Sequence, residues 1–332
     1  MKRLLLLFFL ATPAFAQSIA ATSRGIVVAH HHQIQLFNAA GTEIVWTTDG
    51  VANAASIVAG DDRVAVLDAL SNDVRIVELA NGRGTTVRCG ETPLAGLFAG
   101  RTLYLLERDA RALERIGADG ARASINIAAD PAFLREAGGR LYVYARTAGV
   151  LQEITTSPFA IARTVNVAPF ASDFQIDGKN GYLVYPRDAK IRVVALGSMK
   201  SAGEVAVGAV PVALALASAH TLAVADPSAK RVWMIEGSQS FTQAFARGFL
   251  RGLIGLGIRP SRNSDFPTGV DRVLIRGKTL LAYDTSSGTL YRVAKAKSSA
   301  IAKDVSPQAF TATADAVFVW DDSVRRLQRS PN

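Results

Sequence analysis

Residues 205–237 read VAVGAVPVALALASAHTLAVADPSAKRVWMIEG, and this stretch contains the repeating pattern that decides the fold. Three short apolar runs, VALALAS, TLAVAD and RVWMIE, are separated by small and polar residues that favour turns. Each run is short for a helix and has the length and apolar character of a β-strand. The stretch therefore predicts a meander of short antiparallel strands.

The middle run of this stretch recurs along the whole chain. Eight such runs are present: GIVVA (25–29), VAVLD (64–68), LYLLE (103–107), LYVYA (141–145), YLVYP (182–186), LAVAD (222–226), LLAYD (280–284) and VFVWD (317–321). The last residues of successive runs are 39, 39, 38, 41, 40, 58 and 37 positions apart. A second run follows each of them, a weaker third run follows most, and a fourth precedes the next. Four short strands in a period of about 40 residues indicate a β-propeller blade, so we predict an all-β propeller.

Prolines keep the same period as the apolar runs. Six of them stand 14 to 17 residues before the end of a run: Pro93, Pro131, Pro169, Pro211, Pro267 and Pro307. Proline is tolerated at the first residue of a strand, where no ladder hydrogen bond is lost. We therefore expect each proline to stand just before the innermost strand of a blade, where the chain arrives from the preceding blade.

The number of runs predicts eight blades of about four strands each. Seven blades are the alternative, because a terminal blade can be shared between the two ends of the chain. The last blade has only three apolar runs, at 309–313, 317–321 and 324–328. We expect residues 17–23 to complete the ring, either as an inner first strand or as the missing outer strand of the last blade.

Residues 205–237 also resemble one repeat of the YVTN-type propellers, whose pattern passes from Val-Gly and a proline through two apolar strands to Val-x-Val-Ile-Asp. The stretch is similar to the NHL repeat at Asp226 and at Arg231 and Val232. The other blades are similar through the apolar run and the proline, over most of residues 50–325. This resemblance implies a propeller fold and implies binding as the commonest activity. It implies no catalytic residue.

The chain begins with the features of an export signal. Lys2 and Arg3 precede a short apolar run, and an Ala-x-Ala cleavage site ends at Ala16. We predict that residues 1–16 are a cleaved signal peptide and that residues 17–332 form a single propeller domain, which is periplasmic or secreted. No segment has the length of about 20 apolar residues that a transmembrane helix needs.

Positive charge is concentrated in the last quarter of the chain. From Gln17 to Ser240 there are 21 Lys/Arg and 21 Asp/Glu, whereas from Phe241 to Asn332 there are 14 and 7. A basic region favours anionic partners, so we expect a protein or an anionic glycan or lipid surface and, for an exported chain, no nucleic acid. Cys89 is the only cysteine, which excludes an internal disulfide. We expect a monomer.

The interval of 58 residues indicates an insertion of about 18 residues, which the spacing places at 241–263 between blades six and seven. Phenylalanines four residues apart, with arginines on another face, predict a short amphipathic helix. The predicted contact residues are Phe241, Phe245, Arg247, Phe249, Arg251, Arg259 and Arg262. Three interpretations stay open: a loop packed on the propeller, a lid or partner-binding helix, and a membrane-surface anchor.

We call the eight recurring apolar runs the landmark runs. The turn after each landmark run shares one face of the ring with the connections between blades. Most blades have Asp, Ser or Arg in this turn, whereas the first has His30, His31 and His32. In an extended segment His30 and His32 point the same way, so these two are candidate metal ligands. A catalytic zinc site needs a third protein ligand. A polar turn is the simpler interpretation, because Asp and Ser at turns bond to their own backbone.

The sequence supports catalysis less than binding. The chain contains no Gly-x-Ser-x-Gly and no His-Glu-x-x-His. Propeller enzymes of lactonase or quinoprotein type act at the central channel, and Asp130, Asp173 and Asp265 are the candidates for its mouth. We predict a non-enzymatic binding or scaffold module without a cofactor, and a channel enzyme is the alternative.

Overall fold

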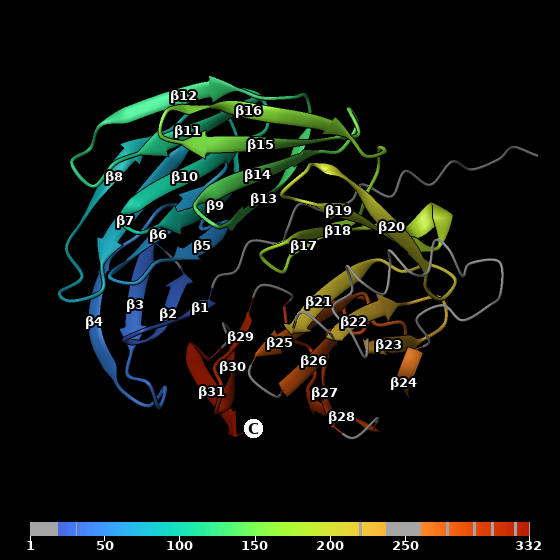
Figure 1. Cartoon of the computed structure of the whole chain (residues 1–332). Coiled ribbons are helices and arrows are strands. Elements are labelled where there is room, and N and C mark those ends of the chain that lie inside the picture. Colours follow the sequence, from blue (N-terminus) through green and yellow to red (C-terminus); the bar gives the residue numbers. More distant parts are fainter. Residues whose placement is uncertain are drawn as a thin grey trace, which may run out of the picture.

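The computed structural model describes residues 19–30, 32–218, 221–236, 260–276, 279–294, 297–306, 309–321 and 324–331. Within these ranges the secondary structure is β-strand throughout, apart from one 3-10 turn, η1 (Pro186–Asp188). The strands form eight antiparallel sheets, seven of four strands and one of three (Figure 1). The predicted all-β propeller of eight blades is confirmed, and the alternative of seven blades is wrong.

Each blade is a meander whose strands follow chain order. Blades one to four consist of β1 (Ile19–Thr22), β2 (Gly25–His30), β3 (Gln33–Phe37) and β4 (Ile44–Asp49); β5 (Ser56–Ala59), β6 (Arg63–Asp68), β7 (Asp73–Glu78) and β8 (Gly84–Arg88); β9 (Pro93–Ala99), β10 (Thr102–Glu107), β11 (Ala112–Ile116) and β12 (Arg122–Asn126); β13 (Pro131–Ala137), β14 (Arg140–Ala145), β15 (Val150–Thr156) and β16 (Phe159–Asn166). Blades five to eight consist of β17 (Asp173–Ile176), β18 (Asn180–Tyr185), β19 (Lys190–Ala195) and β20 (Lys200–Ala206); β21 (Ala213–Ser218), β22 (Thr221–Asp226), β23 (Arg231–Glu236) and β24 (Pro260–Asp265); β25 (Arg272–Arg276), β26 (Thr279–Asp284), β27 (Thr289–Ala294) and β28 (Lys297–Ala302); β29 (Phe310–Ala312), β30 (Ala316–Asp321) and β31 (Arg326–Pro331).

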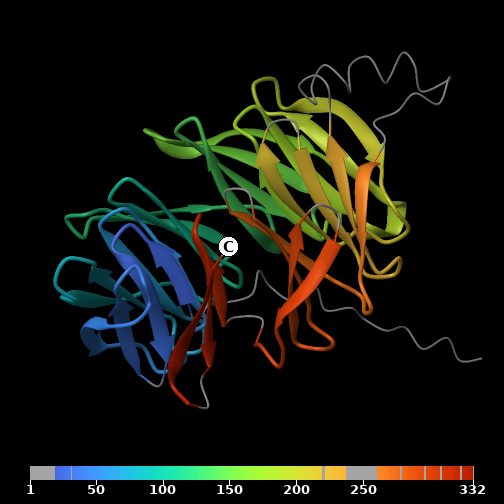
Figure 2. The same ribbon diagram turned by 90° about the horizontal axis from the view of Figure 1, so that it is seen from below.

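The first strand of each blade is the innermost one. From β1 to β25, the first strand of every blade lies beside the first strand of the next, and β29 lies beside β1. Figure 2 shows the resulting ring, in which the last blade (red) lies between the first (blue) and the seventh (orange).

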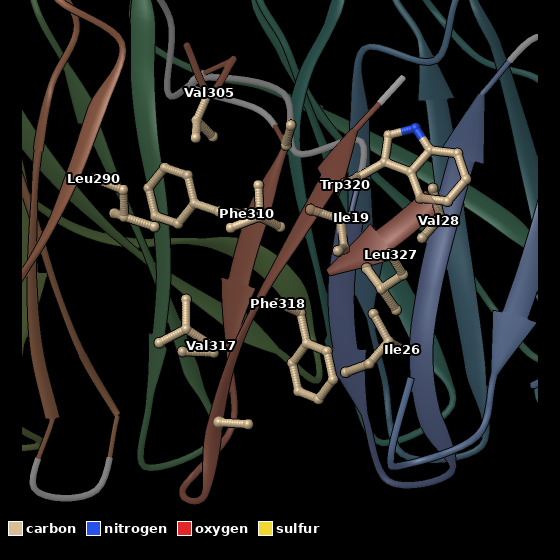
Figure 3. Packing of buried hydrophobic residues seen from close by; sticks show 14 of the residues in the cluster. Ile19, Ile26, Val28, Leu290, Val305, Phe310, Val317, Phe318, Trp320 and Leu327 are labelled. Carbon is tan, nitrogen blue, oxygen red and sulfur yellow. The ribbon is translucent and has the colours of Figure 1, made fainter. Parts of the chain in front are cut away.

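The ring closes through side-chain packing between the first and last blades. β1 pairs with β2 as the innermost strand of blade one, and blade eight has three strands within the described residues. Ile19 and Val28 of blade one belong to the same buried cluster as Phe318 and Trp320 of blade eight (Figure 3). Of the two positions expected for residues 17–23, the structure shows the inner first strand for residues 19–22.

The second strand of each blade carries the strongest apolar pattern because neighbouring blades cover both of its faces. All six residues of β6 and of β18 are buried. The outermost strands instead alternate between exposed and half-buried residues, as β12 does. Most apolar clusters combine side chains of two neighbouring blades, such as Val193 of blade five with Val224 of blade six. The core of the protein therefore lies between the blades.

The prolines stand where the sequence predicts them. Pro93 and Pro131 are the first residues of β9 and β13, and Pro169 and Pro211 lie in the connections that lead to β17 and β21. Pro307 lies outside the described residues.

The long interval lies within blade six, and its predicted position between blades six and seven is wrong. β23 ends at Glu236, and β24 begins at Pro260 and pairs with β23 as the outermost strand of blade six. Residues 260–263 of the predicted insertion are therefore part of a strand, which its polar sequence PSRNSD did not reveal.

Two regions that carry sequence predictions lie outside the described residues: the predicted signal peptide, 1–16, and residues 237–259. The described part of the chain contains no helix with the length and hydropathy of a membrane span.

Candidate functional site

One face of the ring, which we call the crossing face, carries two loops from each of blades one to seven. These loops are the turn between the second and third strands and the connection from the outermost strand to the next blade. In blade one, the amide of Gly50 donates to the carbonyl of His32 (2.7 Å), and in blade two the amide of Cys89 donates to the carbonyl of Asn72 (2.9 Å). The same bond recurs in blades three to seven. Backbone hydrogen bonds therefore fix the loops of this face to one another.

Buried acids at the ends of second strands strengthen this arrangement. Asp68 accepts hydrogen bonds from two amides of its own turn and from the amide of Asn53 in the incoming connection (2.9 Å). Asp226 accepts from the amide of Ala209 in the same way (2.6 Å), and Asp284 accepts from two serines of its turn. The prediction that acids in these turns bond to their own backbone is confirmed for these three residues.

The buried aspartates are ionised, and their carboxylate oxygens accept hydrogen bonds from the surrounding loops. Burial would raise the pKa of Asp68, Asp226 and Asp284, but the hydrogen bonds that they accept outweigh it, and the pKa of each is lowered. A Ca²⁺ site needs six to eight converging oxygens. Within the described residues, no three His, Cys, Asp or Glu side chains form a group that could hold a metal ion.

Blade three differs because its second strand ends in the longer acid Glu107. Its Oε1 accepts from the amide of Gly90 in the connection from blade two (2.6 Å). Its carboxyl group also bonds to that of Glu114, which forms an ion pair with Arg122. Burial and the neighbouring Glu114 raise the pKa of Glu107 to about 7. Glu107 therefore titrates near neutral pH, on a face where the buried aspartates stay ionised.

A second polar position recurs in the third strand of the blades. The residue at this position pairs with the second strand, two residues before that strand ends. Six blades have a long polar side chain there: Gln35, Arg75, Glu114, Gln152, Arg192 and Gln328. Gln152 accepts from the amide of Ala128 (2.8 Å), and Arg192 donates to the carbonyl of Val167 (2.8 Å). Both partners lie in incoming connections. Sequence reasoning missed this position, although the recurrence of polar residues at one offset from the landmark run could have revealed it.

The histidines of blade one occupy positions that belong to the turn. His30 ends β2, its Nε2 lies 3.1 Å from Oε1 of Gln35, and its ring centroid lies 4.8 Å from that of Trp320. His32 is exposed and has a φ of 63°, which departs from the extended backbone that the expected same-sided pair assumes. His31 lies outside the described residues. No third metal-binding side chain joins His30 and His32 within the described part of the chain.

The left-handed conformation of His32 gives a prediction for stability. Asn72 and Gly149 occupy the same position in blades two and four with φ values of 59° and 63°. Glycine adopts this region without steric cost, so we expect His32→Gly to stabilise the fold by about 0.5 kcal/mol. His32→Val should destabilise it by more than about 1 kcal/mol, because a β-branched residue fits this region poorly. Urea unfolding of both variants measures these changes, and a destabilised glycine variant would contradict the assignment.

The three acids predicted at the channel mouth do not converge. Asp173 is the first residue of the innermost strand β17, and Asp130 lies in the connection before β13 with a φ of 56°. Asp265 ends the outermost strand β24, where it forms an ion pair with Arg231 (2.6 Å). An outermost strand lies about 14 Å from the innermost strand of its blade, because three strand spacings separate them. The predicted placement of Asp265 near the channel is therefore wrong.

Asp173 connects the innermost strands of three blades. Its Oδ2 accepts from the amide of Leu214 on β21 (2.8 Å), and its Oδ1 lies 3.9 Å from Nη2 of Arg135 on β13. Burial raises the pKa of Asp173 and lowers that of Arg135, while their mutual attraction opposes both shifts. Its carboxylate oxygens already have partners in the neighbouring strands. The arrangement suits a structural link better than acid–base chemistry.

Exposed apolar side chains gather on the crossing face. Among the described residues, seven large apolar side chains are exposed. Four of them lie in loops of the crossing face: Leu70, Phe170, Val210 and Val324. The other three, Ile44, Val45 and Ile161, lie on the outermost strands β4 and β16. The crossing face thus offers apolar contacts between loops that are already hydrogen-bonded.

The predicted contact residues of the interval 241–263 stay a prediction. Six of them lie between residues 237 and 259, outside the described part of the chain. The seventh, Arg262, belongs to β24, where it is opposite Met234. Strands β23 and β24 flank this interval on the face opposite the crossing face.

Comparisons with known proteins show the fold alone. In sequence, no protein-family model and no curated protein matches the chain. In structure it is similar to BamB from Moraxella catarrhalis (9% identity, TM-score 0.66, 94% of this chain and 95% of that chain). It is also similar to the dihydro-heme d1 dehydrogenase NirN in complex with DHE (12%, 0.69, 96% and 75%) and to a streptogramin B lyase (11%, 0.60, 83% and 92%). The names of the last two proteins denote enzymes, so the fold itself does not separate binding from catalysis.

Proposed function

We propose that the chain is an exported, non-enzymatic propeller that binds a protein or an anionic surface polymer through its crossing face. The proposal is carried by one observation: four of the seven exposed large apolar side chains of the described residues lie in loops of this face. Exposed apolar groups on a rigid surface favour an interaction site, and hydrogen bonds already fix the loops that present them. The excess of 14 Lys/Arg over 7 Asp/Glu from Phe241 to Asn332 supports an anionic partner.

The sequence supports export of this binding module. Residues 1–16 have the organisation of a signal peptide, and we propose a periplasmic or secreted location for the remaining chain. An exported protein does not meet nucleic acid in the cytoplasm, so we propose no such partner. The basic last quarter and the interval 241–263 remain candidates for a second contact region.

The alternative of a channel enzyme has less support. Of the three acids considered, only Asp173 lies on an innermost strand, and its oxygens bond to the neighbouring blades. The buried carboxylates of the crossing face likewise bond to backbone amides of their loops. Acid–base catalysis needs a carboxyl group within reach of a substrate, and these carboxylates already serve the fold.

Photo-crosslinking in the native host tests the proposed binding face. A photoreactive amino acid would replace Leu70 or Val324, which are exposed on the crossing face, or Lys179 or Ser198, which are exposed on the opposite face. We expect a discrete crosslinked product from Leu70 and Val324 and none from Lys179 and Ser198. Products from the opposite face alone, or no product from any position, would overturn the proposal.

A further inference from the structure

Phe170 and Val210 occupy the same repeat position in successive connections of the crossing face. In each connection, one residue donates its backbone amide to the turn between the second and third strands of the preceding blade. Phe170 and Val210 each lie three residues after that donor. Along the chain this position is filled by Asn53, Thr92, Asp130, Phe170, Val210 and Gly269. The first three are polar, whereas the next two are large, apolar and exposed to 47% and 38%. Two neighbouring connections thus present apolar side chains where earlier blades have polar ones.

The backbone at Phe170 makes the choice of residue unusual. Its φ is 65°, and Thr92 and Asp130 have a φ of 56° at the same position. Asn, Asp and Gly fit this left-handed region best, whereas a bulky aromatic residue seldom occupies it. Neither the backbone nor burial explains a half-exposed phenylalanine there. Residues in such conformations concentrate at binding and catalytic sites.

The two connections are fixed side by side. The hydroxyl of Ser172, two residues after Phe170, donates to the carbonyl of Val212 (2.7 Å), which lies two residues after Val210. Asp226 accepts from the amide of Val210 itself (3.3 Å). Phe170 and Val210 therefore lie on one rigid surface, and a ligand would not have to order these loops on binding.

Exposed positive charge lies beside Phe170 and in the turn of the next blade. The guanidinium of Arg187 lies 5.2 Å from the ring centroid of Phe170, and Lys230 is exposed in the turn of the next blade. The acids of the same two turns are already used, because Asp188 forms an ion pair with Arg192 (3.0 Å) and Asp226 is buried. The charge available to a ligand at this point of the crossing face is therefore positive.

We infer that one part of the crossing face binds an acidic segment of a partner protein. This surface, which we call the Phe170–Val210 platform, consists of Phe170, Arg187, Val210 and Lys230. An apolar side chain of this segment contacts Phe170 and Val210, while its carboxylates contact Arg187 and Lys230. The inference rests on the proposed binding function and selects a polypeptide among the anionic partners. An acidic polysaccharide offers carboxylates without an apolar side chain, and it would leave the apolar pair unused.

Fluorescence anisotropy with short labelled peptides tests the inference on the purified full-length chain. The probes carry Glu and Asp around one Leu or Phe, and matched peptides have the acids replaced by Gln and Asn or the apolar residue by Ser. Phe170→Asn removes the aromatic ring and keeps a residue that suits the left-handed backbone. Val210→Ser removes the second apolar contact, and Arg187→Gln removes one of the two cationic contacts. Val45→Ser, Ile161→Ser and Arg83→Gln are controls, since these residues are exposed outside the crossing face.

We expect binding of the acidic apolar peptides, with an affinity about tenfold lower in each platform variant and unchanged in the controls. Equal binding by Phe170→Asn and the unmodified chain would overturn the inference. So would stronger binding of anionic vesicles or acidic polysaccharide than of any peptide. If Leu70 and Val324 still crosslink a partner in the host, these outcomes reject the platform and leave the proposed function intact. If no position crosslinks, the proposed function itself fails.

Discussion

Replacement of Asp226 by alanine is expected to destabilise the propeller by roughly 3–5 kcal/mol, because it removes a buried charged acceptor and leaves its donors without a partner. The carboxylate is completely buried and accepts hydrogen bonds from the amides of Ala209 and Ala229 (2.6 and 3.1 Å) and from the hydroxyl of Ser228 (2.8 Å). A loss of this size lowers the melting temperature by about 10 °C. Thermal unfolding followed by circular dichroism measures it.

The pH dependence and two further variants separate this effect from a general surface effect. Burial would raise the pKa of Asp226, but the hydrogen bonds lower it. A lowered pKa stabilises the fold above the pKa of the unfolded chain, and this contribution is lost as the pH falls through the folded value. The difference between the unmodified chain and Asp226→Ala should therefore shrink in acid. Asp226→Asn should lose less stability, and Asp188→Ala, at an exposed turn acid, should change it by less than about 0.5 kcal/mol. A loss from Asp188→Ala equal to that from Asp226→Ala would contradict the assignment.

The architecture was predictable from the sequence because the second strand of each blade is covered on both faces. Such a strand needs apolar residues at nearly every position, as β6 and β18 do, and this gives the eight landmark runs their strength. Prolines such as Pro93 and Pro131 then locate the innermost strands, since each is the first residue of its strand. Two independent patterns with one period predicted a propeller and favoured eight blades, and the eight sheets of the structure exclude the alternative of seven.

The outer parts of the blades were less predictable for the same physical reason. An outermost strand has one neighbour in its sheet, and its exposed positions accept polar residues. β24, with the sequence PSRNSD, shows no apolar alternation, so the sequence could not show that it completes blade six. Asp265 was consequently placed near the channel although it ends this outermost strand. Spacing along the chain locates a residue in the repeat only where each strand of that repeat is recognisable.

The candidate site depended on backbone conformations that composition does not encode. His32 and Phe170 are left-handed residues at two repeat positions, and both resemble ordinary loop residues in the sequence. His30 and His32 suggested a metal site because their types suit one, yet the left-handed backbone of His32 departs from the assumed extended geometry. The hydrogen-bond partners of Asp226 were equally hidden, although the sequence correctly grouped this acid with the loops of one face.

Glu107 is expected to make the stability of the protein fall as the pH rises through neutrality. Burial and the adjacent Glu114 raise the pKa of Glu107 from 4.5 to about 7 in the folded chain. A carboxyl group with a raised pKa contributes its full stability below the pKa of the unfolded chain, and that contribution disappears as the pH passes the folded value. The free energy of unfolding should therefore decline by on the order of 1–3 kcal/mol between pH 5 and pH 8.

Glu107→Gln should remove this decline, because a glutamine resembles the protonated acid at every pH. Its amide oxygen can still accept from the amide of Gly90, which lies 2.6 Å from Oε1 of Glu107, and its amide nitrogen can donate to Glu114. Urea unfolding at pH 5 and pH 8 should show similar stabilities at pH 5 and a more stable variant at pH 8. Glu91→Gln, at an exposed acid of the same connection, should behave like the unmodified chain. If Glu107→Gln keeps the slope of the unmodified chain, Glu107 is not the source of the pH dependence. If the slope disappears, proton binding at Glu107, favoured by burial and by the neighbouring Glu114, accounts for the loss of stability above pH 5.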